Sequence, residues 1–349
     1  MDSTNTSSIA RPRTNDIAIA CLLSPCAVIG GILNLLVFQL ELSRLKSNGA
    51  SSSSLIRLHL NISDLLVLLI YCPSKVIWQL VFGWYGKDFL CKLVKFCHEL
   101  AFTSSSAILA CIALDRVLCL TRGPFTRGTS RKRLLILISI AWAYSILCSA
   151  KAFFYYNTTL IPRDAWGREQ CTTRTMRLMA EGRLTEADLR WEAIVYISHL
   201  ITSFYLPFLE RQAELEEVRL MAQAPAAGGR STSLTLTQKL SVQQPDSRAG
   251  RLEKRLKQRM LATTALLLTA YFACWLPYQI AALLPMLFPH QYPSSPPAWV
   301  STGCLFLLTL NSVVNPFIYG MYGGKVLAGC ARLRSACRRI AAYYRSSVY

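Results

Sequence analysis

Polar side chains recur at helical spacing in the apolar run 89–120, and their types suit ligand binding. They are an amine, an imidazole, a carboxylate and an aromatic ring: Lys95, His98, Glu99 and Phe102. Residues at i, i+3, i+4 and i+7 share one helix face, and a face this polar needs water or a ligand to solvate it. We therefore expect it to line a ligand pocket. The alternative is an internal ion pair between Lys95 and Glu99, one turn apart.

Further polar and aromatic residues lie at a similar depth in two other apolar runs. Lys75, Trp78 and Gln79 belong to the run 55–82. Tyr278 and Gln279 belong to the run 260–288. We expect these side chains to line the same pocket.

A second set of polar residues lies deep within the apolar runs. It combines one carboxylate with amide and hydroxyl groups: Asp64, Asn34, Ser105, Asn311 and Asn315. A polar group inside a membrane helix costs free energy unless it is paired. Such oxygens suit a hard cation or a water cluster. The alternative is a structural network of hydrogen bonds between helices.

Two prolines interrupt apolar runs. Pro277 and Pro316 lack the backbone N–H, so each is expected to kink its helix. Trp275 lies two residues before Pro277, while Asn315 and Tyr319 flank Pro316. Bulky side chains beside a kink could adopt two positions.

Asp115 and Arg116 are adjacent at the end of the run 89–120. Taken alone, an adjacent acid and base at a helix end fits a solvated ion pair. Their position at the membrane boundary leaves a second role open.

Apolar runs position all these residues. The chain has 349 residues, of which 52% are hydrophobic and 16% charged, whereas about 25% are charged in a soluble domain. A bilayer core needs about 20 apolar residues per helix. Seven runs are candidates: 17–40, 55–82, 89–120, 134–156, 191–209, 260–288 and 299–322. The sequence predicts an all-α membrane protein, a seven-transmembrane helix bundle with no internal repeat of the kind that transporters carry.

The basic residues indicate the orientation. Lys and Arg outnumber Asp and Glu by 38 to 19. They gather between the first and second runs, between the third and fourth, before the sixth and after the seventh. The positive-inside rule then places the N-terminus outside and the C-terminus inside a plasma membrane. So placed, the excess charge favours membrane lipid and a cytoplasmic partner, and no nucleic acid is expected.

The same topology divides the chain. We expect an extracellular N-terminus at 1–16, a seven-helix domain at 17–323 with a partly disordered third intracellular loop at 210–259, and a cytoplasmic tail at 324–349. Asn5 and Asn157 lie in glycosylation sequons on the outer side. The tail is expected to form a short amphipathic eighth helix on anionic lipid, with Cys330 and Cys337 as palmitoylation candidates.

An enzyme finds no support in the sequence. No nucleophile–base or metal-ligand spacing appears, and the four histidines are scattered. No cofactor is expected beyond a sodium ion at the deep polar set.

Motifs in order along the chain resemble the rhodopsin-like (class A) G-protein-coupled receptors. Asn34 opens an Asn-Leu-Leu-Val pattern, and Asp64 ends Leu-Asn-Ile-Ser-Asp. Asp115-Arg116-Val closes the third run. The sixth run contains Phe-Ala-Cys-Trp-Leu-Pro-Tyr and the seventh Asn-Ser-Val-Val-Asn-Pro-Phe-Ile-Tyr. The resemblance covers nearly the whole chain.

The resemblance implies roles for these residues. Asp64, Ser105, Asn311 and Asn315 match the family's sodium-binding cluster. Trp275 matches the aromatic switch beneath the ligand, and Asn315, Pro316 and Tyr319 match the switch of helix seven. Arg116, beside Asp115, matches the arginine that engages a heterotrimeric G protein after helix six moves outward. Cys91 and Cys171 match the family's extracellular disulfide.

Within the class, the chain resembles the gonadotropin-releasing hormone, adipokinetic hormone and vasopressin/oxytocin receptors. That likeness implies an extracellular neuropeptide or peptide hormone as ligand. His98 stands where many of that branch carry Lys, and Lys75 where an acid or amide is common. The ligand's charge preference is therefore expected to differ.

The fifth run departs from the family. Pro207 is followed by only two apolar residues before the acidic stretch 210–217, where the family continues apolar for about two more turns. Either this helix is displaced, or the sequence is a splice or gene-model variant that lacks a segment. This departure favours one alternative to a receptor, a non-signalling binding protein. A transporter or channel is the other alternative, against which the lack of repeats argues.

Overall fold

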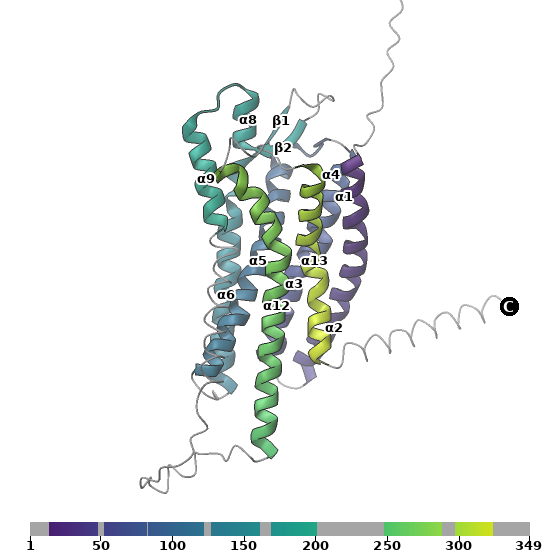
Figure 1. Ribbon diagram of the computed structural model, residues 1–349, viewed down its shortest axis with the longest axis vertical. Helices are drawn as coiled ribbons and strands as arrows, with labels where there is room; N and C mark the ends of the chain where they lie inside the picture. Colours follow the sequence, from purple (N-terminus) through teal and green to yellow (C-terminus); the bar gives the residue numbers. More distant parts are fainter. Residues whose placement is uncertain are drawn as a thin grey trace, which may run out of the picture.

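The computed structural model describes residues 14–47, 52–81, 83–121, 127–160, 169–200, 248–287 and 297–323, which form a bundle of long helices (Figure 1). Six helices in these ranges are long and apolar enough to cross a membrane: Asn15–Lys46, Ser53–Val81, Lys87–Arg116, Arg131–Tyr155, Leu261–Leu284 and Ala298–Ile318. They correspond to every predicted span except the fifth, so a helical membrane bundle is confirmed. At the place of the fifth stands α9 (Glu186–Leu200); the rest of the predicted run 191–209 lies outside the described residues.

The first two spans each contain a π-helical turn. The first consists of α1 (Thr14–Pro25), η1 (Cys26–Gly30) and α2 (Gly31–Ser47), and the second of α3 (Ser52–Leu66), η2 (Val67–Tyr71) and α4 (Cys72–Val81). Pro73 explains η2, because its ring has no N–H and would clash with the carbonyl of residue 69 in a regular helix. Gly30 lets the first span approach the seventh: a Cβ there would lie 2.8 Å from Val313 Cγ2.

The remaining long helices are continuous. They are α5 (Lys87–Thr121), α6 (Arg127–Ala150) followed by the short α7 (Ala152–Tyr155), α12 (Arg248–Leu287) and α13 (Ala298–Gly323). Pro277 lies within α12 and Pro316 within α13, and neither ends its helix. The helix α12 begins twelve residues before the predicted start at 260, so part of the predicted loop 210–259 is helical.

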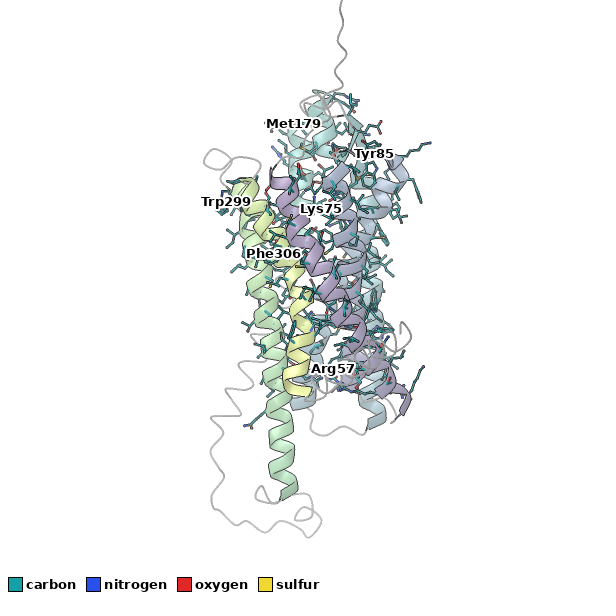
Figure 2. All side chains as sticks on the ribbon, turned by 90° about the vertical axis from the view of Figure 1, so that its right-hand side faces the viewer. Arg57, Lys75, Tyr85, Met179, Trp299 and Phe306 are labelled. Carbon is teal, nitrogen blue, oxygen red and sulfur yellow. A yellow bond between two sulfur atoms is a disulfide. The ribbon has the colours of Figure 1, made fainter. Side chains whose placement is uncertain are left out.

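One end of the bundle is covered by a β-hairpin, and we call it the hairpin end (Figure 1). Strand β1 (Tyr156–Leu160) pairs antiparallel with β2 (Glu169–Thr173), and α8 (Arg174–Ala180) follows. Figure 2 labels Tyr85 and Met179 at this end and Arg57 at the opposite end, which we call the Arg57 end.

A capping box starts α9 beside the hairpin. The Thr185 hydroxyl accepts from the Asp188 N–H at 3.3 Å, while the Asp188 carboxylate accepts from the Thr185 N–H at 3.2 Å. The hydrogen bonds from Thr185 hold the pKa of the Asp188 carboxyl below its usual value. The box thereby fixes where the helix leaves the hairpin end.

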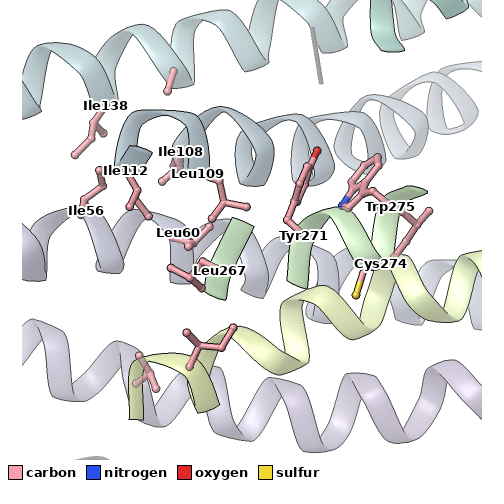
Figure 3. Close-up of a cluster of buried hydrophobic side chains, with 14 of the residues drawn as sticks. Ile56, Leu60, Ile108, Leu109, Ile112, Ile138, Leu267, Tyr271, Cys274 and Trp275 are labelled. Carbon is pink, nitrogen blue, oxygen red and sulfur yellow. The ribbon is translucent and has the colours of Figure 1, made fainter. Parts of the chain in front are cut away.

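The apolar core lies between the third, sixth and seventh spans, with contributions from the second and fourth. Figure 3 shows its centre, where Leu60, Ile108, Leu109 and Leu267 pack together and Tyr271 and Trp275 extend the cluster along α12. This cluster extends along the bundle from Ile56, next to Arg57, to Trp275 and Tyr278.

Candidate functional site

Two lysines from different helices converge on one tryptophan near the hairpin end. Lys75 and Trp78 lie one turn apart on α4, and Lys75 Nζ lies 4.9 Å from the Trp78 ring centroid. Lys95 reaches the same ring from α5, with Nζ at 4.6 Å, and lies 4.9 Å from the ring of Tyr156 on β1. Figure 2 shows Lys75 in the hairpin-end half of the bundle. We call Lys75, Trp78, Lys95 and Tyr156 the lysine–tryptophan cluster.

The carboxylate beside this cluster, that of Glu99, forms its ion pair with a lysine outside the cluster. Glu99 lies one turn from Lys95, but its Oε2 pairs with Lys151 Nζ at 3.3 Å. Lys151 comes from the junction between α6 and α7. Within the described part of the chain, neither Lys75 nor Lys95 has a carboxylate within ion-pair distance. The pairing of Lys95 with Glu99, the alternative to a pocket, is therefore not formed.

An aromatic series runs from the stripe of α5 towards the core. The His98 ring is buried, with Nε2 2.6 Å from the Ser74 hydroxyl, and it meets the Tyr71 ring edge-on. Tyr71 contacts Phe102 at a centroid distance of 4.7 Å, and Phe102 contacts Trp275 at 5.6 Å. The predicted residues His98, Phe102 and Trp275 are thus joined through Tyr71.

The other predicted pocket residues are less closely joined to this group. Gln279 is buried, and its Oε1 accepts from the Tyr196 hydroxyl of α9 at 3.1 Å. Tyr278 is half-buried and packs against the central apolar cluster. Gln79 is half-buried and makes no side-chain hydrogen bond to another described residue.

The hairpin is tied to the start of α5 above the lysine–tryptophan cluster. Cys91 and Cys171 form a disulfide, as the resemblance implied, with their Cα atoms 5.5 Å apart. The Asp88 carboxylate accepts from the Thr158 N–H at 3.0 Å. Trp78 Nε1 donates to Gln170 Oε1 at 3.1 Å, so β2 also holds the indole on which the lysines converge.

The predicted deep polar set lies in the middle of the bundle. Asn315 Nδ2 donates to both carboxylate oxygens of Asp64 at 3.0 Å, and both residues are 0% exposed. The Ser105 hydroxyl and the side-chain oxygens of Asn311 and Asn315 are buried and have no hydrogen-bond partner among the described residues. Within the set, Asp64 and Asn315 are in contact, and three further buried oxygens lack a hydrogen-bond partner among the described residues.

Asn34 belongs to a neighbouring network instead. Its Nδ2 donates to the carbonyls of Gly30 and Ser312 at 2.9 and 3.0 Å, and its Oδ1 accepts from Asn61 at 2.6 Å. These bonds join the first, second and seventh spans. These bonds are of the kind that the alternative reading, a structural network between helices, expects.

Asp115 and Arg116, at the Arg57 end, both contact residues of other helices. Asp115 pairs with Arg133 of α6 at 3.0 Å and lies 3.8 Å from Arg116 Nη1. Arg116 Nη2 also donates to the Ser53 hydroxyl of α3 at 3.3 Å. Asp115 therefore contacts arginines from two helices. It does more than form a solvated ion pair with the adjacent Arg116.

Sequence reasoning missed several residues of the site. Tyr71, at the end of η2, repeats with Ser74, Lys75 and Trp78 of α4 the same i, i+3, i+4, i+7 spacing as the stripe on α5. That spacing was a usable signal for Tyr71 and Ser74. No sequence signal marked Tyr156 or Gln170, because the hairpin brings them to the cluster from segments that are distant in the sequence.

Some predicted residues lie beyond what the structure describes. Asn5, Cys330, Cys337 and the tail 324–349 are outside the described residues, as is the acidic stretch 210–217. Pro316 is buried in α13. The side chain of Tyr319 is not among those described, whereas Asn157 is half-buried in β1.

Comparisons with known proteins agree with this architecture. A family model described as 7 transmembrane receptor (rhodopsin family) matches residues 34–319. The G-protein coupled receptor daf-38 of Caenorhabditis elegans is 27% identical, over 85% of this chain and 86% of the relative. The isotocin receptor of Catostomus commersonii is 23% identical (83% and 70%). The gonadotropin-releasing hormone receptor of Octopus vulgaris is 24% identical (89% and 72%).

Proposed function

The chain belongs to the rhodopsin family of seven-transmembrane receptors, and from that premise we propose that it is a plasma-membrane receptor for an extracellular peptide which signals through a heterotrimeric G protein. The observation that carries the proposal is the polar stripe of α5 beneath a disulfide-tied hairpin, joined by aromatic contacts to Trp275. The similarity to isotocin and gonadotropin-releasing hormone receptors supports a peptide ligand. Receptors, not enzymes, make up the matched family.

We place the hairpin end outside the cell. The disulfide there fits an oxidising compartment, and Asn157 lies in a sequon on the hairpin. The basic residues of α12 and of the start of α6 lie at the Arg57 end, where the positive-inside rule puts the cytoplasm. The tail would then lie along anionic lipid as an eighth helix, with Cys330 and Cys337 available for palmitoylation.

The conformational change caused by ligand binding would be transmitted to the cytoplasmic side by α12. Trp275 is buried against Phe102 and Tyr271, and Pro277 lies two residues further along the same helix. A ligand that favours another position of Phe102 or Trp275 would favour outward movement of helix six. It shifts that equilibrium only by its difference in affinity for the two states.

The deep polar set would bind a sodium ion in the inactive state. Its donor atoms are hard oxygens, which suit such a cation, and three of them lack a hydrogen-bond partner among the described residues. Asp64, Ser105, Asn311 and Asn315 would hold the ion. Its charge would compensate the buried carboxylate.

A second candidate is a non-signalling binding protein of the same architecture. The sequence Glu210–Glu217 favours it, because four charged carboxylates follow Pro207 where the family remains apolar. Sequencing the transcript across codons 205–215 separates the two. A longer apolar run in the transcript supports the signalling receptor.

The proposal is tested by a screen of the full-length chain in cells. Calcium and cyclic AMP are measured while amidated neuropeptides of the isotocin and gonadotropin-releasing hormone type are added. Arg116→Ala is expected to abolish the response while peptide binding survives, because Arg116 would contact the G protein. Arg131→Ala, an exposed arginine at the same end, is the control. Equal signalling by Arg116→Ala would contradict the proposal.

A further inference from the structure

We propose that the lysine–tryptophan cluster binds a carboxylate of the ligand, held between the ammonium groups of Lys75 and Lys95. This inference rests on the proposed function, since it assumes that the hairpin end receives a ligand. It adds a chemical requirement: the ligand carries an acidic side chain or a free carboxyl terminus at the part that reaches α4 and α5.

The first argument is the balance of charge around the cluster. Three lysines, at positions 75, 95 and 151, stand near Glu99, while the neighbouring Glu192 accepts a hydrogen bond from the Tyr155 hydroxyl at 2.7 Å. Lys151 Nζ forms an ion pair with Glu99 Oε2 at 3.3 Å. Asp16 acts on Lys75 only from beyond ion-pair distance. In the described part of the chain, neither Lys75 nor Lys95 therefore has a carboxylate within ion-pair distance.

The second argument is geometric. Lys75 and Lys95 come from different helices, yet both ammonium groups lie less than 5 Å from the centroid of the same indole. The two ammonium groups are therefore within about 10 Å of each other, a separation at which like charges in a half-buried site still repel, and nothing in their sequence positions requires them to converge. An anion placed between them would turn that repulsion into two charge-assisted hydrogen bonds.

The third argument is that the cluster is built rather than incidental. The indole of Trp78 is fixed by its hydrogen bond to Gln170 at 3.1 Å and by edge-on packing against Trp84, with centroids 5.6 Å apart. The aromatic faces of Trp78 and Tyr156 attract the ammonium groups but offer them no conventional acceptor. Each ammonium carries three donors, so hydrogen-bonding capacity remains for a ligand.

Access to the cluster is consistent with this role. Lys75, Trp78, Lys95 and Tyr156 are all half-buried rather than sealed. They lie between the disulfide-tied hairpin and the buried His98 of the aromatic series. A bound carboxylate would therefore lie directly above the contacts that lead to Trp275.

The test uses three matched dipeptides that differ only in their carboxylates. N-acetyl-Phe-Glu amide carries a side-chain carboxylate, N-acetyl-Phe-Gln a terminal carboxylate, and N-acetyl-Phe-Gln amide neither. Each is titrated against the purified full-length chain in phosphatidylcholine nanodiscs, and the rise in unfolding temperature gives its apparent Kd. This readout needs no G protein, so it can succeed or fail independently of the signalling proposal.

We expect at least one acidic dipeptide to bind about tenfold more tightly than the neutral one. The two acidic probes show which source of carboxylate the cluster prefers. Lys75→Gln and Lys95→Gln are expected to remove the preference. Lys92→Gln is the control, because Lys92 lies on the same helix but pairs with Asp88 at 2.5 Å, and it is expected to keep the preference.

Three results would overturn the inference. In the first, the neutral dipeptide binds the wild type as tightly as both acidic dipeptides. In the second, no dipeptide binds. In the third, the preference for an acidic dipeptide persists in both Lys75→Gln and Lys95→Gln. If a glutamine variant does not fold, Lys95→Arg and Lys75→Arg retain the charge and must retain the preference. Loss of the preference in both arginine variants, with folding intact, would also count against a charge-based site.

Discussion

Half-buried positive charges have different partners at the two ends of the bundle. At the Arg57 end, Glu41 is 2% exposed and pairs with Arg44 and with Arg57 at 3.1 Å. Asp115 at the same end pairs with Arg133. At the hairpin end, the acid Glu99 takes Lys151, and the two lysines of the cluster are left facing one indole.

The charges at the Arg57 end form ion pairs between helices. The two lysines of the lysine–tryptophan cluster form none with a described residue and are available to bind a ligand. Removing one member of a buried pair leaves an uncompensated charge and is costly. Removing an unpaired cation relieves repulsion and costs little. The Arg57 end should therefore lose stability when its charges are neutralised, whereas the hairpin end should lose ligand affinity.

The largest effect is expected from the disulfide that fixes the hairpin end. Cys91→Ser should destabilise the fold by about 2–4 kcal/mol, because the hairpin is then held to α5 only by noncovalent bonds. Thermal unfolding of the full chain measures this. Cys97→Ser, which removes a free thiol from the same helix, is the control, and an equal effect of both variants would mean that the hairpin end does not depend on its crosslink.

Neutralising Glu41 at the Arg57 end should have the next largest effect on stability. Glu41→Gln leaves Arg57 and Arg44 without their carboxylate and is expected to cost about 1–3 kcal/mol, since the arginines retain part of their hydration. Glu186→Gln breaks the exposed pair with Arg190 and should cost well under 1 kcal/mol. If the unfolding temperature falls equally in both, the pair at Glu41 is not a structural one.

Asp64, midway between the ends, tests whether a mobile ion can take the place of a fixed partner. Replacing choline chloride by sodium chloride should stabilise the wild type, by about 1.4 kcal/mol at ten times the sodium Kd. Asp64→Asn should abolish this stabilisation, and Asp16→Asn should keep it. An unchanged sodium response in Asp64→Asn would rule out the proposed ion site.

The smallest effect concerns the core between the two ends. Tyr271 and Ser106 share a buried hydrogen bond of 2.6 Å between α12 and α5. Tyr271→Phe and Ser106→Ala should each cost about 1 kcal/mol, and the double variant should cost less than their sum. Strictly additive unfolding temperatures would show that the bond contributes no coupling between the helices.

Motifs that depend on local sequence were predictable. Asp64 and Asn315 were expected to act together and are in contact, and the pairing of Cys91 with Cys171 was implied by the resemblance and is formed. The stripe on α5 followed from helical spacing alone. These features depend on periodicity or on motifs that keep their order along the chain.

Features that depend on contacts between distant segments were not predictable. Whether Glu99 pairs with Lys95 or with Lys151 depends on how α5 packs against the junction of α6 and α7. The convergence of Lys75 and Lys95 on Trp78 requires the relative rotation of two helices, which hydrophobic periodicity does not fix. The early start of α12 at Arg248 was missed because polar helix beyond the membrane carries no apolar signal.

Thermal unfolding without ligand tests the central contrast most directly. The double variant Lys75→Gln/Lys95→Gln and the single variant Glu41→Gln are compared with wild type in the same nanodiscs. We predict that the lysine variant unfolds at or above the wild-type temperature, because it relieves repulsion, while Glu41→Gln unfolds below it. A lysine variant that loses as much stability as Glu41→Gln would show that the hairpin-end cations are structural, and would contradict the account.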